Sequence, residues 1–292
     1  MNRRHGAPHR PSLESPTVAD DAVDDASVDD ASPGAAAARP ASLWPKEHGA
    51  YGILAVPMLV ALAVGGTSWV AWAIATSAIA AFLSHESLMI ATLRRGRRVR
   101  QATPRAIPTG VAGAAIVLVA GLAAFAGGSS AVRVALAICL AVASVGLWLS
   151  VSGYQRSLVA QLAAMIGLTL PGATVVLVGT GSTIAALSFL GAWVVGRTAT
   201  TTAVRATILA SRKNPSLAAR IVHDGLLTGV TTAGAIAAVR FGGVWFAALP
   251  LLAAAWGLRI VCPGPKRLKQ VGWSILAINL VAGAIAVLSI GR

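Results

Sequence analysis

The stretch W-P-K-E-H-G-A-Y-G-I-L-A-V-P, which runs from Trp44 to Pro57, divides the chain into a polar part and an apolar part. The residues before it include seven acidic residues and four arginines, whereas the residues after it form long apolar runs with only two further acidic residues. Within the stretch the charged residues come first and a continuous apolar run follows. We therefore predict that it lies at a membrane surface and leads the chain into the bilayer.

The composition indicates an integral membrane protein. Of the 292 residues, 56% are hydrophobic and only 12% are charged, and the mean hydropathy is +0.73. Soluble domains carry about a quarter charged residues. The net charge of +14 does not indicate nucleic-acid binding, because the basic residues lie in short connections without interleaved aromatic residues. In such places they set topology and contact anionic lipid headgroups.

The N-terminal region has a different composition from the rest of the chain. Residues 1–43 are rich in Ala, Pro, Ser and Asp and contain the crude repeat D-D-A-V-D-D-A-S-V-D-D-A-S. Such a sequence does not bury enough apolar surface to offset the loss of chain entropy on folding. We predict that residues 1–43 form a disordered cytoplasmic tail and that residues 44–292 form one transmembrane domain.

Nine apolar segments follow the tail, and they predict an all-α polytopic membrane protein with nine transmembrane helices. The connections after the even-numbered segments all carry Lys or Arg, including six arginines between Arg94 and Arg105, whereas the others carry none or a single Arg. The positive-inside rule then places the N-terminus inside and the C-terminus outside a bacterial-type cytoplasmic membrane. The nine segments are Gly49–Val64, Trp69–Leu93, Gly110–Ala126, Val132–Ser152, Leu158–Val178, Ile184–Ile208, Gly225–Val239, Val244–Leu258 and Val271–Ile290.

The seventh segment has a regular pattern of small residues. Gly225, Gly229, Ala233 and Ala237 recur at every fourth position, so they share one face of a helix. Small residues on one face let helix backbones approach closely in lipid. We predict that this stripe packs against a neighbouring helix.

Each acidic residue of the membrane domain has a histidine beside it in the sequence. An ionisable residue within a membrane segment is costly unless it is paired, so it indicates a functional site. Two alternatives follow: the His and carboxylate side chains converge on a metal ion, or they pair with basic residues and hold helices together. The three pairs are Glu47–His48, His85–Glu86 and His223–Asp224.

The sixth segment carries basic residues on one face. Arg197, Thr201 and Arg205 are four residues apart and share a face of the predicted helix. One alternative is an ion pair between Arg197 and Glu86, with Arg205 extended to the membrane surface. The other is an anion site, in which the two guanidinium groups grip phosphate or carboxylate oxygens.

Three sequence features carry a resemblance to a known family. They are the opening P-K-E-H-G-A-Y at Pro45–Tyr51, the basic run after the second segment and the two arginines eight residues apart in the sixth. In these features the chain resembles the YwiC-like family of bacterial membrane proteins over about residues 44–292. The resemblance implies a multi-pass membrane protein and no particular activity.

A second stretch, Y-Q-R-S-L-V-A-Q-L-A-A-M-I-G-L-T-L-P from Tyr154 to Pro171, is similar to UbiA-type membrane prenyltransferases. This resemblance implies a UbiA-like bundle of nine helices. Those enzymes bind Mg²⁺ and diphosphate through Asp-rich motifs on the second and sixth helices. This chain lacks the Asp-rich motifs, so we predict no bound cofactor and keep Mg²⁺ only as an alternative. The corresponding positions are His85, Glu86, Arg197, Thr201 and Arg205.

These observations leave three classes of function open. The first is a UbiA-like scaffold that binds an anionic lipid, such as an isoprenoid, in a cytoplasmic-facing pocket, with an activity no more than that of a divergent prenyltransferase. The second is a small-molecule or proton-coupled transporter, and the third is a non-catalytic assembly protein for other membrane complexes. The expected partners are membrane lipids, anionic headgroups among them. The candidate ligand-binding residues are Lys46, Glu47, His48, His85, Glu86, Arg156, Arg197, Thr201, Arg205 and Asp224.

Overall fold

The computed structural model describes residues 40–43, 48–92, 94–154, 157–210, 216–264 and 267–290. The chain divides into two units, Met1–Ala37 and Ala38–Arg292, and all described residues belong to the second. Residues 1–39 of the predicted tail and the candidate site residues Lys46, Glu47 and Arg156 lie outside the described residues. Of His48 only the main chain is described.

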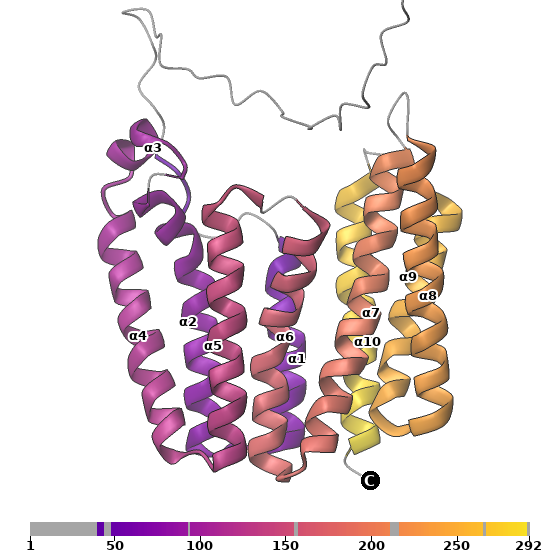
Figure 1. The fold of residues 1–292 in the computed structure, drawn as a ribbon, viewed down its shortest axis with the longest axis horizontal. Helices are drawn as coiled ribbons and strands as arrows, with labels where there is room; N and C mark the ends of the chain where they lie inside the picture. Colours follow the sequence, from indigo (N-terminus) through magenta and orange to yellow (C-terminus); the bar gives the residue numbers. More distant parts are fainter. Residues whose placement is uncertain are drawn as a thin grey trace, which may run out of the picture. The chain divides into compact units, whose positions relative to one another are not determined.

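The described residues form helices joined by short connections, and no strand occurs among them (Figure 1). This confirms the all-α class. The helices are α1 (His48–Gly65), α2 (Trp69–Ala91), α3 (Arg97–Ala102), α4 (Ala106–Gly127), α5 (Ser130–Val151), α6 (Leu158–Thr180), α7 (Thr183–Ala210), α8 (Leu217–Phe241), the 3₁₀ turn η2 (Gly243–Ala247), α9 (Ala248–Val261) and α10 (Leu268–Ile290).

Each of the nine apolar segments corresponds to a helix, and seven of these helices are long and apolar enough to cross a membrane by length and composition. The seven lie in α2, α4, α5, α6, α8, η2 with α9, and α10. The protein is therefore a multi-pass membrane protein. The apolar part of α1, Tyr51–Gly65, is shorter, and α7 has 28 residues but carries two arginines and six threonines. For α1 and α7 the membrane crossing stays a prediction, as does the orientation.

Helix α8 begins earlier than expected for a local reason. The seventh segment was expected to start at Gly225, but α8 starts at Leu217 because the hydroxyl of Ser216 accepts a hydrogen bond from Ala219 N at 3.4 Å. A capped helix begins before its apolar stretch does, so hydropathy misses its polar first turns. The arginine-rich connection after α2 also contains a short helix, α3, that was not predicted.

The core of the described unit lies where α1 packs against α6. A Cβ placed on Gly179 in α6 would overlap the carbonyl oxygen of Gly65 in α1. About two turns along α6, a Cβ on Gly172 would lie 3.4 Å from the carbonyl oxygen of Pro57, which is a normal contact distance. Gly179 thus admits only a hydrogen atom, so the two backbones come into direct contact there. Buried side chains of α7, Phe189 among them, complete the core.

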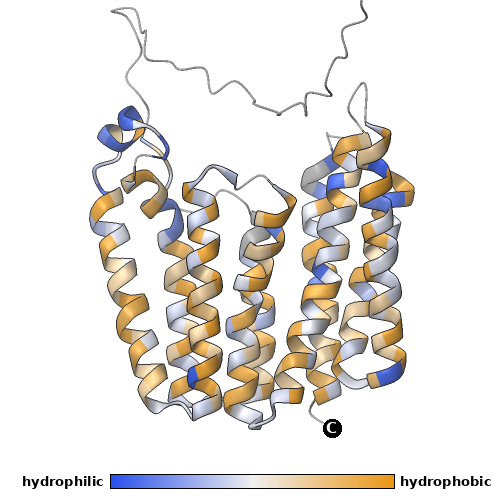
Figure 2. Ribbon diagram, viewed as in Figure 1, coloured by the Kyte–Doolittle hydropathy of each residue, from blue (hydrophilic) through white to orange (hydrophobic). Residues whose placement is uncertain are grey.

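The lipid-facing surface belongs mainly to α4 and α5. Of the 22 residues of α5 only Val132 is buried, and apolar residues recur along both helices (Figure 2). In water such a surface would be unstable, whereas lipid chains solvate it. The close side of α4 faces α2, where a Cβ on Gly113 would overlap the side chain of Ser84.

The predicted packing stripe on α8 is wrong at three of its four positions, because only Ala237 is buried. Gly225, Gly229 and Ala233 are exposed, and a Cβ on either glycine would meet no neighbouring atom within 4 Å. Gly234 makes the close approach instead, since its Cβ would lie 2.7 Å from the side chain of Val195 on α7. Lipid and neighbouring helices are equally apolar, so a small-residue pattern does not tell which of the two a helix face meets.

The α1–α6 contact predicts a difference between two glycines. Gly179→Ala should lower the free energy of unfolding by about 1–3 kcal/mol, because the added methyl group must push two helix backbones apart. Gly229→Ala is the matched control and should leave stability equal or higher. Thermal unfolding of the purified protein in detergent measures both. Equal stability of the two variants would contradict the close packing of α1 on α6.

The nine-span topology predicts a pattern of thiol labelling. In a Cys139→Ala background, Thr67→Cys after α1 should react with a membrane-impermeant maleimide on intact cells, while Cys262 should react only after permeabilisation. Both positions are exposed, so access depends on the side of the membrane. Protection of Thr67→Cys in intact cells would show that α1 does not cross.

Candidate functional site

A buried guanidinium group holds α7 to α1 at a proline. Pro57 lies inside α1, and because proline has no N–H, the carbonyl oxygen of Ile53 four residues earlier has no helical donor. Arg197 of α7 is 2% exposed, and its Nη1 donates to that carbonyl oxygen. The arginine therefore replaces the hydrogen bond that the proline removes, so this main-chain acceptor next to the core is not left unpaired.

The same guanidinium group also reaches α10. Arg197 Nη2 donates to Gly52 O at 3.3 Å and to Asn279 Oδ1 at 3.4 Å. The group lies 5.1 Å from the centre of the Trp193 ring, which favours a cation. Arg197 Nε has no partner among the described residues. One side chain thus joins three helices through main-chain and amide oxygens.

The expected ion pair between Arg197 and Glu86 is wrong. Glu86, in α2, forms a salt bridge with Arg95 in the following connection. Arg95 Nε donates to Glu86 Oε1 at 3.0 Å, and Arg95 Nη2 donates to Glu86 Oε2 at 2.9 Å. The pair is local because Arg95 lies nine residues after Glu86, where the chain turns back at the end of α2. A nearby arginine in a connection reaches a carboxylate at a helix end more easily than one on a distant helix.

The other residues of the basic face of α7 turn toward α6. Thr201 Oγ1 donates to Met165 Sδ at 3.2 Å, and Arg205 Nε donates to Gln161 Oε1 at 2.7 Å. Arg197 instead points to α1 and α10. The described contacts therefore divide the two arginines between different helices, and an anion site between them stays a prediction.

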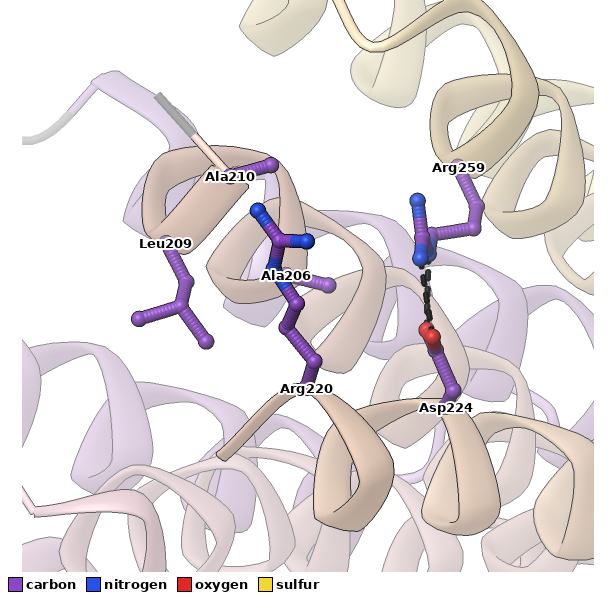
Figure 3. Close-up of a pocket in the computed structure, with 6 residues that line it drawn as sticks. All are labelled: Ala206, Leu209, Ala210, Arg220, Asp224 and Arg259. Atoms are coloured by element: carbon purple, nitrogen blue, oxygen red, sulfur yellow. Dashed lines mark hydrogen bonds and ion pairs between the residues drawn. The ribbon is translucent and has the colours of Figure 1, made fainter. Parts of the chain in front are cut away.

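A pocket of about 130 Å³ lies where α7 ends, α8 begins and α9 ends (Figure 3). Its charged residues are Arg220 and Asp224, from the first two turns of α8, and Arg259, from the last turn of α9. Asp224 and Arg259 form a bidentate salt bridge. Arg259 Nε donates to Asp224 Oδ1 at 2.7 Å, and Arg259 Nη2 donates to Asp224 Oδ2 at 2.8 Å. The wall on the side of α7 consists of Ala206, Leu209 and Ala210.

Local structure places these three charged groups. Ser216 caps α8, so Arg220 and Asp224 follow one turn apart on the same side. The α9 helix ends at Cys262, whose φ of 43° lies in the left-handed region, and Arg259 Nη1 donates to Cys262 Sγ at 3.6 Å. His223 is held by its own helix, since Nδ1 lies 2.7 Å from Ala219 O.

Arg220 and Arg259 were not among the residues selected from the sequence. Arg220 stood among the basic residues of a connection, and Arg259 directly followed a predicted span. Both therefore looked like topology signals. The separation between Asp224 and Arg259 in the chain, 35 residues, gives no sequence pattern that would have linked them.

The His–carboxylate pairs do not gather into one cluster in the described part of the chain. Glu86 pairs with Arg95 at the end of α2, and Asp224 pairs with Arg259 between α8 and α9. Within the described ranges no three His, Cys, Asp or Glu side chains lie close enough together to hold a metal ion. The two described acids thus follow the alternative in which carboxylates pair with basic residues.

Comparison with known proteins finds one similarity, in the first half of the domain. Residues 44–176 match the profile of the family described as YwiC-like protein. This part of the chain is similar to YwiC-like proteins. No curated protein and no solved structure matches the chain, so the resemblance to UbiA-type enzymes stays a prediction.

The YwiC-like part extends from the start of α1 to near the end of α6. It contains the proline-interrupted helices α1 and α6, with Pro57 and Pro171. The resemblance was expected to reach residue 292, but the match ends at residue 176. Arg197 and the charged residues of the pocket lie beyond the YwiC-like part, so the family match assigns them no role.

The contact between Arg197 and the freed carbonyl group predicts a specific coupling. Pro57→Ala restores a main-chain N–H that can donate to Ile53 O, so Arg197→Met should cost less stability in that background than in the wild type. We expect a coupling free energy of about 1 kcal/mol or more from a double-mutant cycle of detergent unfolding.

Glu86→Gln supplies the control for this cycle. It should combine additively with Arg197→Met, because Glu86 is bound to Arg95. Additivity of Pro57→Ala with Arg197→Met, or coupling of Arg197 to Glu86, would contradict the arrangement.

Proposed function

We propose that the protein is an integral membrane protein that binds the headgroup of an anionic membrane lipid in the pocket between α7, α8 and α9. The observation that carries the proposal is the pair of guanidinium groups, Arg220 and Arg259, facing one small pocket with a single carboxylate, Asp224 (Figure 3). The described lining therefore has an excess of one positive charge.

Arg220 supplies donors for such a ligand. Its side chain is exposed, and it forms no ion pair with any described residue. Phosphate oxygens accept charge-assisted hydrogen bonds from a guanidinium fork. Each such bond is worth about 1.5–3 kcal/mol, and less where solvent screens it. The alanine and leucine side chains of α7 give the opposite wall an apolar surface suited to the carbon atoms next to a phosphate.

The place of the pocket in the fold fits a lipid headgroup. It lies at the ends of α8 and α9, both of which belong to segments long and apolar enough to span a membrane. The ends of such helices lie at the level of the headgroups. Under the predicted orientation this is the cytoplasmic leaflet, where anionic lipids attract basic residues.

The proposed binding differs from that of UbiA-type enzymes in how the phosphate is held. Those enzymes use several carboxylates and Mg²⁺, whereas this pocket offers guanidinium groups and one carboxylate that is already paired. Direct contact with arginine needs no metal ion. Binding should therefore persist in EDTA.

A transporter is the second candidate, and one observation favours it. Helices α1 and α6 each contain a proline, and they pack together near Pro57 and Gly172. Paired interruptions of membrane helices are a feature of transporter binding sites. In this structure the interruption in α1 is occupied by Arg197, and Trp193 and Phe189 fill the space beside it. The headgroup proposal is therefore better supported.

The proposal predicts that one arginine of α8 matters for lipid binding and another does not. Arg220→Gln should weaken binding of phosphatidylglycerol about tenfold, or ~1.4 kcal/mol, because the free guanidinium group of the pocket is lost. Arg240→Gln removes the same charge from the opposite end of the same helix and should have little effect. Native mass spectrometry of the full chain, with and without EDTA, measures the bound lipid.

Three outcomes would contradict the proposal. They are binding no stronger than that of phosphatidylcholine, equal losses in the two variants, and binding that disappears in EDTA and returns with Mg²⁺.

A further inference from the structure

The carboxylate of Asp224 forms a salt bridge with Arg259, one of the two arginines of the pocket. Both of its oxygens accept hydrogen bonds from Arg259, at 2.7 Å and 2.8 Å, and the remaining nitrogen of that guanidinium group, Nη1, donates to Cys262 Sγ. Figure 3 shows the two groups facing each other, with the guanidinium group of Arg220 apart from them. Among the described residues of the pocket, a ligand therefore finds one arginine without an ion pair and one that is already neutralised.

This arrangement fixes how much negative charge the pocket can balance. In the described lining, Arg220 and Arg259 contribute two positive charges and Asp224 one negative charge, so its charged residues sum to +1. A ligand with one negative charge brings this sum to zero. A phosphate monoester carries about −1.5 to −2 at pH 7, so it would add uncompensated negative charge beside the carboxylate of Asp224.

We infer that Asp224 makes the pocket select singly charged phosphodiester headgroups over doubly charged phosphate monoester headgroups. This inference rests on the proposed function, because it names the class of headgroup that the same pocket takes. Asp224 acts as a positioning and specificity residue: it holds Arg259 in place and repels a second negative charge on the ligand. Like-charge repulsion of this kind excludes a competing ligand without any added attraction to the preferred one.

The chain contains a matched control for Asp224. Glu86 and Arg95 form a second bidentate salt bridge near the end of α2, with hydrogen-bond distances of 3.0 Å and 2.9 Å. Glu86→Gln and Asp224→Asn therefore make the same chemical change to the same kind of pair. Only the second change raises the charge of the pocket.

The experiment is a competition between phosphatidylglycerol and phosphatidate with identical acyl chains, added to the purified full-length protein and read by native mass spectrometry. Wild-type protein should retain phosphatidylglycerol in preference. Asp224→Asn should shift the ratio toward phosphatidate about tenfold, or ~1.4 kcal/mol, and Glu86→Gln should leave the ratio unchanged. Preference of the wild type for phosphatidate, or equal shifts in the two variants, would overturn the inference.

A second variant keeps the test independent of the stability of the pair. Ala210→Lys adds a positive charge to an exposed position of the lining and leaves Asp224 bound to Arg259. It should shift the ratio in the same direction as Asp224→Asn, and an unchanged ratio would count against selection by charge. If neither lipid binds better than phosphatidylcholine, the proposed function itself fails. If both bind equally well, only the inference fails.

Discussion

The carbonyl oxygen of Ile53 lacks a helical donor because Pro57 has no N–H, and a main-chain acceptor next to the core is costly to leave unpaired. Arg197 supplies the donor from α7, and its other nitrogen reaches Gly52 and Asn279. This one group sets the relative positions of α1, α7 and α10. It also explains how a guanidinium group persists in the core without a carboxylate among its described contacts, because it is bound to oxygens that themselves needed donors.

This constraint separates the charged groups of the protein into two kinds. Arg197 is committed to the main chain of α1, is almost fully buried and contributes to the packing of helices. Arg220, Asp224 and Arg259 lie at a small pocket where α7 ends, α8 begins and α9 ends, and its described lining has an excess of positive charge. The arginine that looks most unusual in the sequence therefore serves the fold, and two arginines that resemble ordinary topology signals face the pocket.

Several features could be read from the sequence because they depend on composition and on local order along the chain. The nine apolar segments correspond to nine helical regions, since apolar length and helix formation go together in a chain that a bilayer solvates. The opening at Pro45–Tyr51 led to the family whose profile matches residues 44–176. Sequence spacing also placed Arg197, Thr201 and Arg205 on one helix, but it did not say that Thr201 and Arg205 face α6 while Arg197 faces α1.

The sequence by itself determined the fold class, the apolar segments and the unusual charges within them, because hydropathy and helical periodicity are properties of neighbouring residues. Only the tertiary structure decided which charges pair. Glu86 pairs with Arg95 instead of Arg197, and Asp224 pairs with Arg259, 35 residues later in the chain. Gly234, instead of Gly225, makes the close contact of α8 with its neighbours. The physical reason is that lipid and protein neighbours are equally apolar. The sequence of a membrane helix therefore gives little indication of which face packs against another helix. The neighbouring helices are determined by how closely the backbones fit and by the few polar groups that need hydrogen-bond partners.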